Sequence, residues 1–247
     1  MNGRSELPMI QGIMNKHASF RPSDFFNQEM AEAYDQRNAG LKPLSDCLHF
    51  QMRLVLSSLP EQARVLCVGV GTGADIFALA SERPDLSFVG VDPSAEMLEV
   101  ARHRLDEAGI GARCELVPGY VADAPRDEFD AAVSLLVAHF VQRKDRPEFY
   151  RAIYDRLAPG GRFVSAEISC DLDAPGFPEM LEDWKQVHAM MGASEESLAS
   201  LGETLRHTLS VVGPAETEAL WREAGFAKPV PFYQAFMIRG WHTRKPA

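Results

Sequence analysis

A glycine-rich turn between an apolar run and a helical pattern constrains the fold of this chain more than any other feature. The sequence reads Val65-Leu66-Cys67-Val68-Gly69-Val70-Gly71-Thr72-Gly73-Ala74, so three glycines at alternate positions follow a strand-like segment. Glycine lets a backbone turn tightly and lets a ligand approach closely, because a Cβ would collide with it. The helix that follows directs free N–H groups and its positive dipole end at an anionic group. The turn therefore predicts a ligand site at the carboxyl end of this strand.

An acid at the end of the next strand-like run strengthens this interpretation. Asp92 closes the segment Phe88–Asp92, where a carboxylate can accept both hydroxyls of a ribose, and ligands of such sheets bind outside the carboxyl ends of the strands. The structural alternative is that the glycines only form a strand-to-helix turn and that Asp92 caps the next helix. The combination of strand, glycine turn, helix and acid favours the ligand site.

The chain alternates between strand-like and helix-like segments from residue 64 to residue 168. We expect strands over 64–70, 86–91, 113–117, 129–137 and 162–168, and helices over 74–81, 95–108 and 146–157, the last one stopped by Pro159-Gly160-Gly161. Near-continuous apolar strands separated by helices imply parallel strands that are covered on both faces. The pattern predicts an α/β protein with a doubly wound, mostly parallel seven-stranded sheet and helices on both faces.

The segments outside this alternation suggest the domain organisation. We expect residues 1–25 to form an N-terminal arm and residues 26–247 to form one domain, which begins with helices over 26–37 and 43–58. An apolar helical stripe at 177–191 lies within residues 169–212, which we expect to form a helical insertion that acts as a lid. A helix over 214–225 and a pair of strands over 230–241 complete the predicted domain.

The charge and the cysteines of the chain indicate which classes of partner and which cell compartment to expect. Lys and Arg number 25 and Asp and Glu 35, which gives a formal net charge of -10 and disfavours nucleic acid and anionic membranes as partners. The longest nearly unbroken apolar stretch, 131–141, is far shorter than the ~20 residues of a membrane span, and residues 1–20 do not read as a signal peptide. Four widely spaced cysteines without a CxxC pair predict free thiols and a cytoplasmic protein. No spacing of His, Asp or Glu predicts a metal site.

These ordered motifs resemble the class I S-adenosylmethionine-dependent methyltransferases. The resemblance covers about residues 26–241 and includes, besides the glycine turn and Asp92, the segment Phe129–Val133, the turn Leu157–Phe163 and the helix end Ala224-Gly225-Phe226. The tail more faintly resembles carboxy-S-adenosylmethionine synthases. The resemblance implies S-adenosyl-L-methionine as cofactor, with these cofactor-binding residues: Tyr34, Gly69, Val70, Gly71, Thr72, Gly73, Asp92, Pro93, Met97, Tyr120, Val121 and Leu135.

Two positions depart from the family pattern. Most members have an acid where this chain has Cys67, and that acid helps to hold the methionine ammonium, so carbonyls or another residue must do so here. Members also usually carry an acid near the adenine amino group in a Gly-Asp pair, where this chain reads Gly119-Tyr120. Tyr120 can stack on adenine or hydrogen-bond it, and Val121 can still offer its backbone N–H.

Candidates on the acceptor side follow the fourth and fifth strands and the insertion. His139 is a candidate general base or orienting group, or a helix-start histidine bonded to backbone. Glu167 is a candidate for orienting the acceptor or meeting the ammonium, or a partner of a neighbouring arginine. Trp184, His188 and Tyr233 are candidate substrate-binding residues, and for the stripe that contains Trp184 core packing is the alternative.

The predicted activity is methyl transfer to a small, partly apolar metabolite by in-line displacement. A carboxy-S-adenosylmethionine synthase-like enzyme is an alternative and would need a cation for the transferred carboxylate, for which Arg206 is the candidate in the insertion. A non-catalytic, S-adenosylmethionine-binding regulatory protein is another. A nicotinamide enzyme also fits Gly69-x-Gly71-x-x-Ala74, but Gly73 and the Pro-Gly-Gly turn argue against it. The partner is a small-molecule acceptor, with no nucleic acid and no membrane, and a homodimer is compatible with the sequence.

Overall fold

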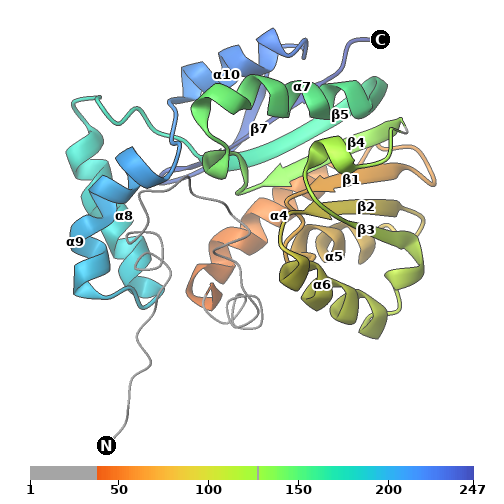
Figure 1. Ribbon diagram of the computed structural model, residues 1–247, viewed down its shortest axis with the longest axis horizontal. Helices are drawn as coiled ribbons and strands as arrows, with labels where there is room; N and C mark the ends of the chain where they lie inside the picture. Colours follow the sequence, from red (N-terminus) through yellow and green to blue (C-terminus); the bar gives the residue numbers. More distant parts are fainter. Residues whose placement is uncertain (1–37, 127) are drawn as a thin grey trace, which may run out of the picture.

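A seven-stranded sheet with the order β3-β2-β1-β4-β5-β7-β6 organises the computed structural model, which describes residues 38–126 and 128–247 (Figure 1). The strands are β1 (Arg64–Val68), β2 (Ser87–Asp92), β3 (Cys114–Pro118), β4 (Phe129–Leu135), β5 (Leu157–Ile168), β6 (Val230–Ala235) and β7 (Ile238–Arg244). β1 to β5 pair in parallel, whereas β7 runs antiparallel to both β5 and β6. The predicted α/β fold with a mostly parallel, seven-stranded sheet is confirmed.

The sheet order creates a switch point between β1 and β4. The chain moves outward from β1 to β2 and β3 and then returns to place β4 on the other side of β1. In sheets of this kind the crevice for a ligand lies at the carboxyl ends of the strands on either side of the switch point. The glycine turn follows β1 and therefore begins at this crevice.

Helices cover both faces of the sheet (Figure 1). One face carries α4 (Lys42–Leu56), α5 (Ala74–Ala80) and α6 (Ala95–Glu107), and the other carries α7 (Arg146–Arg156) and α10 (Pro214–Glu223). Val65 and Cys67 of β1 belong to the apolar cluster of the first face, and Leu66 and Val68 to that of the second. Because β1 is buried on both faces, its sequence reads as a continuous apolar run.

Short helical turns connect the main elements. Five of them are 3-10 turns: η1 (Ala39–Leu41), η2 (Gly111–Arg113), η3 (Val121–Asp123), η4 (Ala138–Phe140) and η5 (Arg143–Asp145). Two of these turns, η3 and η4, follow β3 and β4 directly at the carboxyl edge of the sheet. They therefore help to build the crevice, and their Val121 and Ala138 also join the apolar cluster of the second face.

The start of β5 differs from the prediction. The sequence predicted a turn at Pro159-Gly160-Gly161 and a strand from Arg162, but β5 already begins at Leu157. The pairing of β5 with β4 shifts register between Phe129 and Ala131. Residues 158–161 of β5 therefore form a bulge-like irregularity within the strand. Gly160 has φ +78°, a conformation that glycine adopts without strain, and its N–H donates to the carbonyl of Lys245 at 3.0 Å.

The predicted insertion is helical. It contains α8 (Phe177–Met190), α9 (Glu195–Glu203) and the π-helix η6 (Thr204–Thr208). These helices lie beyond the end of the sheet toward which the β4 arrow points (Figure 1), and α8 and α9 add buried side chains to the apolar cluster that contains α4. That these residues act as a lid, and that residues 26–247 form one domain, stay predictions. The predicted arm and the helix over 26–37 lie outside the described residues.

Two further features concern partners. Within residues 38–126 and 128–247, no helix has the length and apolar character of a membrane span. The same part of the chain contains no group of three potential metal ligands among His, Cys, Asp and Glu. Cys47, Cys67, Cys114 and Cys170 are free thiols, as the sequence predicted.

Candidate cofactor-binding and active site

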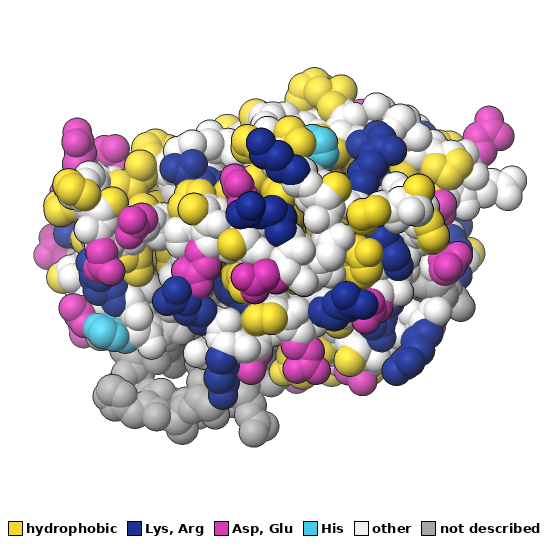
Figure 2. Space-filling view, turned by 90° about the horizontal axis from the view of Figure 1, so that it is seen from above, with side chains coloured by type: hydrophobic (Ala, Val, Ile, Leu, Met, Phe, Trp, Pro, Cys, Tyr) yellow, Lys and Arg dark blue, Asp and Glu magenta, His cyan; other side chains and the backbone are white. Residues whose placement is uncertain are grey.

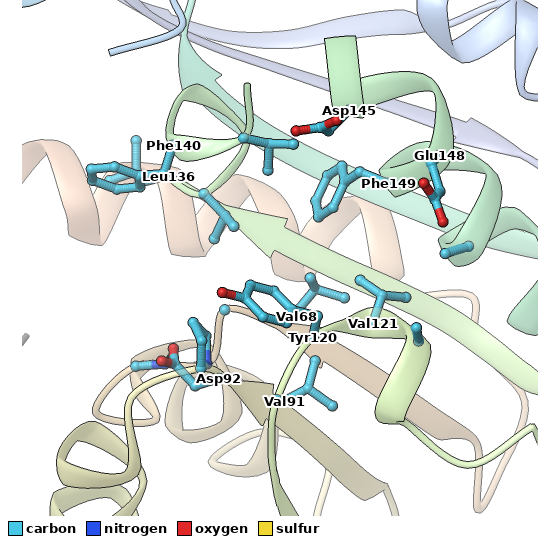
Figure 3. Close-up of a pocket in the computed structure, with 18 of the residues that line it drawn as sticks. Val68, Val91, Asp92, Tyr120, Val121, Leu136, Phe140, Asp145, Glu148 and Phe149 are labelled. Carbon is cyan, nitrogen blue, oxygen red and sulfur yellow. The ribbon is translucent and has the colours of Figure 1, made fainter. Parts of the chain in front are cut away.

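A cavity of about 450 Å³ lies at the carboxyl ends of β1, β2 and β4 (Figure 3). Its volume lies within the range of roughly 300–1,000 Å³ that is typical of small-molecule sites. The cavity brings together eight of the predicted cofactor residues: Gly69, Gly71, Asp92, Pro93, Met97, Tyr120, Val121 and Leu135. The switch point predicted from the strand order is therefore hollow.

The glycine turn adopts backbone conformations that glycine reaches more readily than any other residue. Gly69 and Gly71 have φ of +65° and +54°, in the left-handed region that side chains with a Cβ rarely adopt. A Cβ on Gly69 would lie 2.4 Å from Cγ2 of Val137, which is too close for any real contact. The bare backbone of this turn therefore forms part of the cavity wall.

Asp92 is buried at the end of β2, and each of its two carboxylate oxygens accepts a hydrogen bond from a backbone N–H. Its Oδ1 accepts the N–H of Ser94 and its Oδ2 accepts the N–H of Gly71, both at 2.9 Å. Burial raises the pKa of Asp92, and these two hydrogen bonds oppose the rise. A carboxylate has about four acceptor positions, so each oxygen retains capacity for a ligand hydroxyl.

The structural alternative for Asp92 was a helix cap. The cap of α6 is Ser94, whose Oγ accepts the N–H of Met97 at 3.1 Å. Asp92 instead lines the cavity and supports both Ser94 and the glycine turn. Its geometry fits the grip on a pair of vicinal hydroxyls that the sequence predicted.

Tyr120 and Val121 form the cavity wall after β3. Tyr120 is 57% exposed, so its ring face is available to a flat ligand. Val121 begins η3, where a backbone N–H has no partner within the turn, and among the described residues no acceptor contacts this N–H. The N–H of Gly119 donates to the carbonyl of Asp92 at 2.9 Å and holds this loop against β2.

The remaining predicted cofactor residues do not line the cavity. Val70, Thr72 and Gly73 are buried beneath the turn, and Val70 packs against Gly90, where a Cβ would approach its side chain to 3.0 Å. These residues shape the turn from below. Tyr34 lies outside the described residues.

Cys67, which replaces the usual acid, is completely buried. Its side chain belongs to the apolar cluster beneath α4, α5 and α6, and burial raises the pKa of its thiol well above the usual value. A neutral thiol in this position offers no charge to the methionine ammonium, as the sequence indicated.

His139 lies in η4 but does not line the cavity, which corrects the expected cleft position. It is 4% exposed, and its Nδ1 accepts the N–H of Ile168 at 3.4 Å. Burial, followed by the charge of Arg146, lowers its pKa to about 3. The geometry therefore matches the alternative of a backbone-bonded histidine that stays neutral.

Glu167 also lies away from the cavity, inside a buried polar network. Its Oε2 accepts from Nη1 of Arg146 at 2.7 Å, and its Oε1 accepts the hydroxyl of Thr217 at 3.0 Å and that of Tyr150 at 3.3 Å. Burial raises the pKa of Glu167, whereas the Arg146 charge and the hydroxyl donors oppose the rise. The expected position at the acceptor is corrected to a pairing with arginine, which was the alternative.

The three candidate substrate residues are packing residues in the described structure. Trp184 is 3% exposed and meets the ring of His188 edge-on at 5.2 Å between centroids. Burial lowers the pKa of His188 to about 4. The hydroxyl of Tyr233 donates to the carbonyl of Leu44 at 3.1 Å and so links β6 to α4. None of the three contributes to the wall of the cavity described above.

The opposite wall of the cavity contains residues that the sequence analysis missed. Leu136, Phe140, Asp145, Glu148 and Phe149 line it, and Figure 3 shows the last three on α7 and its start, across from Asp92. Leu136 has φ +60°, a strained conformation of the kind that clusters at functional sites. The spacing 145, 148, 149 and 152 puts one face of α7 on the cavity and was a signal that the sequence contained.

Comparisons with known proteins match this geometry. A family model described as a methyltransferase domain matches residues 65–161, which span β1 to the start of β5. Over these residues the chain is similar to the class I S-adenosylmethionine-dependent methyltransferases. S-adenosylmethionine is the cofactor of this family. Its amino-acid end fits the bare glycine turn, its ribose fits the two oxygens of Asp92, and its adenine fits the exposed ring of Tyr120.

Individual relatives add detail. The carboxy-S-adenosyl-L-methionine synthase of Campylobacter curvus is 29% identical over 69% of this chain and 72% of its own length. The synthase of Desulfotalea psychrophila is 24% identical over 90% and 91%. An O-methyltransferase family protein from Burkholderia thailandensis has a similar fold, with a TM-score of 0.69 at 15% identity over 97% of this chain and 68% of its own.

Proposed function

We propose that this protein transfers the methyl group of S-adenosylmethionine to a small, partly apolar metabolite by in-line displacement. The observation that carries the proposal is Asp92, a buried carboxylate whose two oxygens are oriented by backbone and face the cavity. Asp92 would hold the ribose, Tyr120 and Val121 the base, and Gly69 and Gly71 the amino-acid end. The bound cofactor supplies a methyl group on a positively charged sulfur.

The chain's own contribution to the reaction is positioning and exclusion of water. Leu135, Leu136, Val137 and Phe140 give the part of the cavity after β4 an apolar wall. An apolar wall keeps water from the reacting atoms, and holding two reactants in line can supply about 7–11 kcal/mol. His139 and Glu167 lie outside this wall, so the proposed mechanism assigns no proton transfer to them.

Carboxyl transfer is the second candidate because the two relatives named above are carboxy-S-adenosyl-L-methionine synthases. That chemistry calls for a cation near the transferred carboxylate. Among the described residues that line the cavity there are three acids, Asp92, Asp145 and Glu148, and no lysine or arginine. Arg206 donates to Oδ1 of Asp173 at 3.0 Å and lies over the ring of Phe177. This charge distribution supports methyl transfer from a cationic donor.

Binding of S-adenosylhomocysteine tests the proposed cofactor site. We expect Asp92→Asn to lower the affinity by about 1.5–3 kcal/mol, roughly 10- to 150-fold, because a hydrogen bond to a charged group is lost. Isothermal titration calorimetry measures the effect. Asp85→Asn removes the same charge at a surface pair with Arg83 and serves as control. Equal affinities of the wild type and Asp92→Asn would refute the site.

Product analysis separates the three activities. The purified protein is incubated with methyl-labelled S-adenosylmethionine and a small-molecule extract, and the products are analysed by mass spectrometry. A labelled small molecule supports methyl transfer, whereas a carboxylated cofactor supports the second candidate. Cofactor binding without any product would support the regulatory alternative.

The class of acceptor, the cellular location and the oligomeric state belong to the same proposal. The net charge of -10 supports a small-molecule acceptor over nucleic acid, and on the face seen in Figure 2 basic and acidic side chains are interspersed. A cytoplasmic location and a homodimer stay predictions of the sequence.

A further inference from the structure

We infer that Glu148, on the first turn of α7, recognises the exocyclic amine of the cofactor's adenine and replaces the acid that Gly119-Tyr120 lacks. The inference rests on the proposed cofactor site. It assigns base specificity to a helix that follows β4, whereas the sequence motif would place this function directly after β3.

The order of the strands fixes where the base must lie. β1, β2 and β3 are consecutive neighbours in the sheet, and their carboxyl ends carry the glycine turn, Asp92 and Tyr120 in that order. A ligand with its amino-acid end on the turn and its ribose on Asp92 therefore has its base near Tyr120 and Val121. This part of the cavity lies against η3 (Figure 3).

Helix α7 closes this end of the cavity. Its Arg156 donates from Nη2 to the carbonyl of Ala122 at 2.7 Å and to that of Ala124 at 3.1 Å, which fixes the helix to η3. Ala152, Phe149 and Glu148 lie on the same helical face as Arg156 and line the cavity. The wall opposite Tyr120 is therefore built by α7.

Glu148 is the acid on this wall that is better placed for the base. It lies about 12 Å along the helix axis from Arg156, and Asp145 lies about 16 Å away, at 1.5 Å per residue. Figure 3 shows Glu148 on the side of Val121 and Asp145 farther toward Leu136 and Phe140. Glu148 is exposed, and among the described residues none forms an ion pair or hydrogen bond with its carboxylate.

The chemistry of a carboxylate selects an amine. The exocyclic amine of adenine donates hydrogen bonds, which an ionised carboxylate only accepts. The N–H of Val121 can donate to the neighbouring ring nitrogen. A hypoxanthine base presents a carbonyl instead of the amine, and this carbonyl would meet the Glu148 carboxylate without a proton between them.

The test compares S-adenosylhomocysteine with S-inosylhomocysteine, its deaminated analogue, on the wild type and on Glu148→Gln. The amide of glutamine can donate to the hypoxanthine carbonyl and loses the charge that favours the amine. We express the preference as the dissociation constant of S-inosylhomocysteine divided by that of S-adenosylhomocysteine. We expect this ratio to fall about tenfold or more in Glu148→Gln. Asp145→Asn is the matched control and should leave the ratio unchanged, and thermal unfolding verifies that both exposed substitutions leave the fold intact.

The possible results separate this inference from the proposed function. An unchanged ratio in Glu148→Gln, or a fall in Asp145→Asn instead, overturns the inference while binding of S-adenosylhomocysteine to the wild type still supports the cofactor site. Failure of the wild type to bind S-adenosylhomocysteine overturns the proposed function itself. A fall confined to Glu148→Gln supports both.

Discussion

Two buried acids, one at the end of β2 and one near the end of β5, show how the surroundings decide the role of a residue. Asp92 accepts the backbone N–H groups of Gly71 and Ser94 and faces the cavity, whereas Glu167 contacts the side chains of Arg146, Thr217 and Tyr150. The sequence predicted the role of Asp92 because its partner Gly71, although 21 residues away, lies in a recognisable glycine-rich turn. The partners of Glu167 lie in α7 and α10 and belong to no such motif, so sequence pattern could not identify them.

The network around Glu167 leads to a prediction about stability. We expect Glu167→Gln to lower the free energy of unfolding by about 3–5 kcal/mol, because it leaves the buried charge of Arg146 without its counterion. Urea denaturation measures this change, and calorimetry on the folded variant should give the wild-type affinity for S-adenosylhomocysteine. A loss of affinity without a loss of stability would instead place Glu167 in the functional site.

At the scale of elements, sequence periodicity predicted the helices and strands of the sheet but not the environment of the insertion. The stripe at 177–191 is helical as expected, and its buried side chains join the core on the α4 face. Apolar spacing predicts a buried face but does not say whether core or ligand covers it. The early start of β5 was missed because Pro159-Gly160-Gly161 usually ends an element, whereas here it forms a strand irregularity.

Trp184 tests whether α8 belongs to the core. We expect Trp184→Ala to lower the free energy of unfolding by about 3–5 kcal/mol, as is usual for a large buried aromatic residue. Trp184→Phe should cost much less, because the Nε1 that it removes is buried without an acceptor among the described residues. Urea denaturation of both variants measures the difference. Equal stability of the wild type and Trp184→Ala would show that α8 is not part of the core and would favour the predicted lid.

For the whole molecule, one buried histidine, His139, and one half-buried histidine, His188, couple folding to pH. Burial lowers the pKa of His139 to about 3 and that of His188 to about 4, whereas an unfolded chain has histidine pKa values of about 6.5. Below pH 6.5 the unfolded state binds protons that the folded state does not, so each histidine lowers stability as the pH falls toward its folded value. Above pH 6.5 this contribution to stability is complete.

Acid titration of stability tests this coupling. Between pH 6.5 and 4.5 we expect each of the two histidines to contribute a loss that approaches, at most, about 1.4 kcal/mol per pH unit. His188→Gln should remove one of these contributions and make the pH dependence correspondingly shallower. Urea denaturation across this range gives both slopes, and parallel curves for the wild type and the variant would contradict the half-buried, neutral state of His188.

The position of β7 between β5 and β6 has a consequence for the order of assembly. β6 precedes β7 in the chain, yet among the described strands β6 pairs with β7 alone and reaches the rest of the sheet through it. A ribosome therefore delivers the outermost strand before the strand that it must lie beside. Until residues 238–244 pair with β5, that edge of the parallel strands stays open and β6 has no place in the sheet.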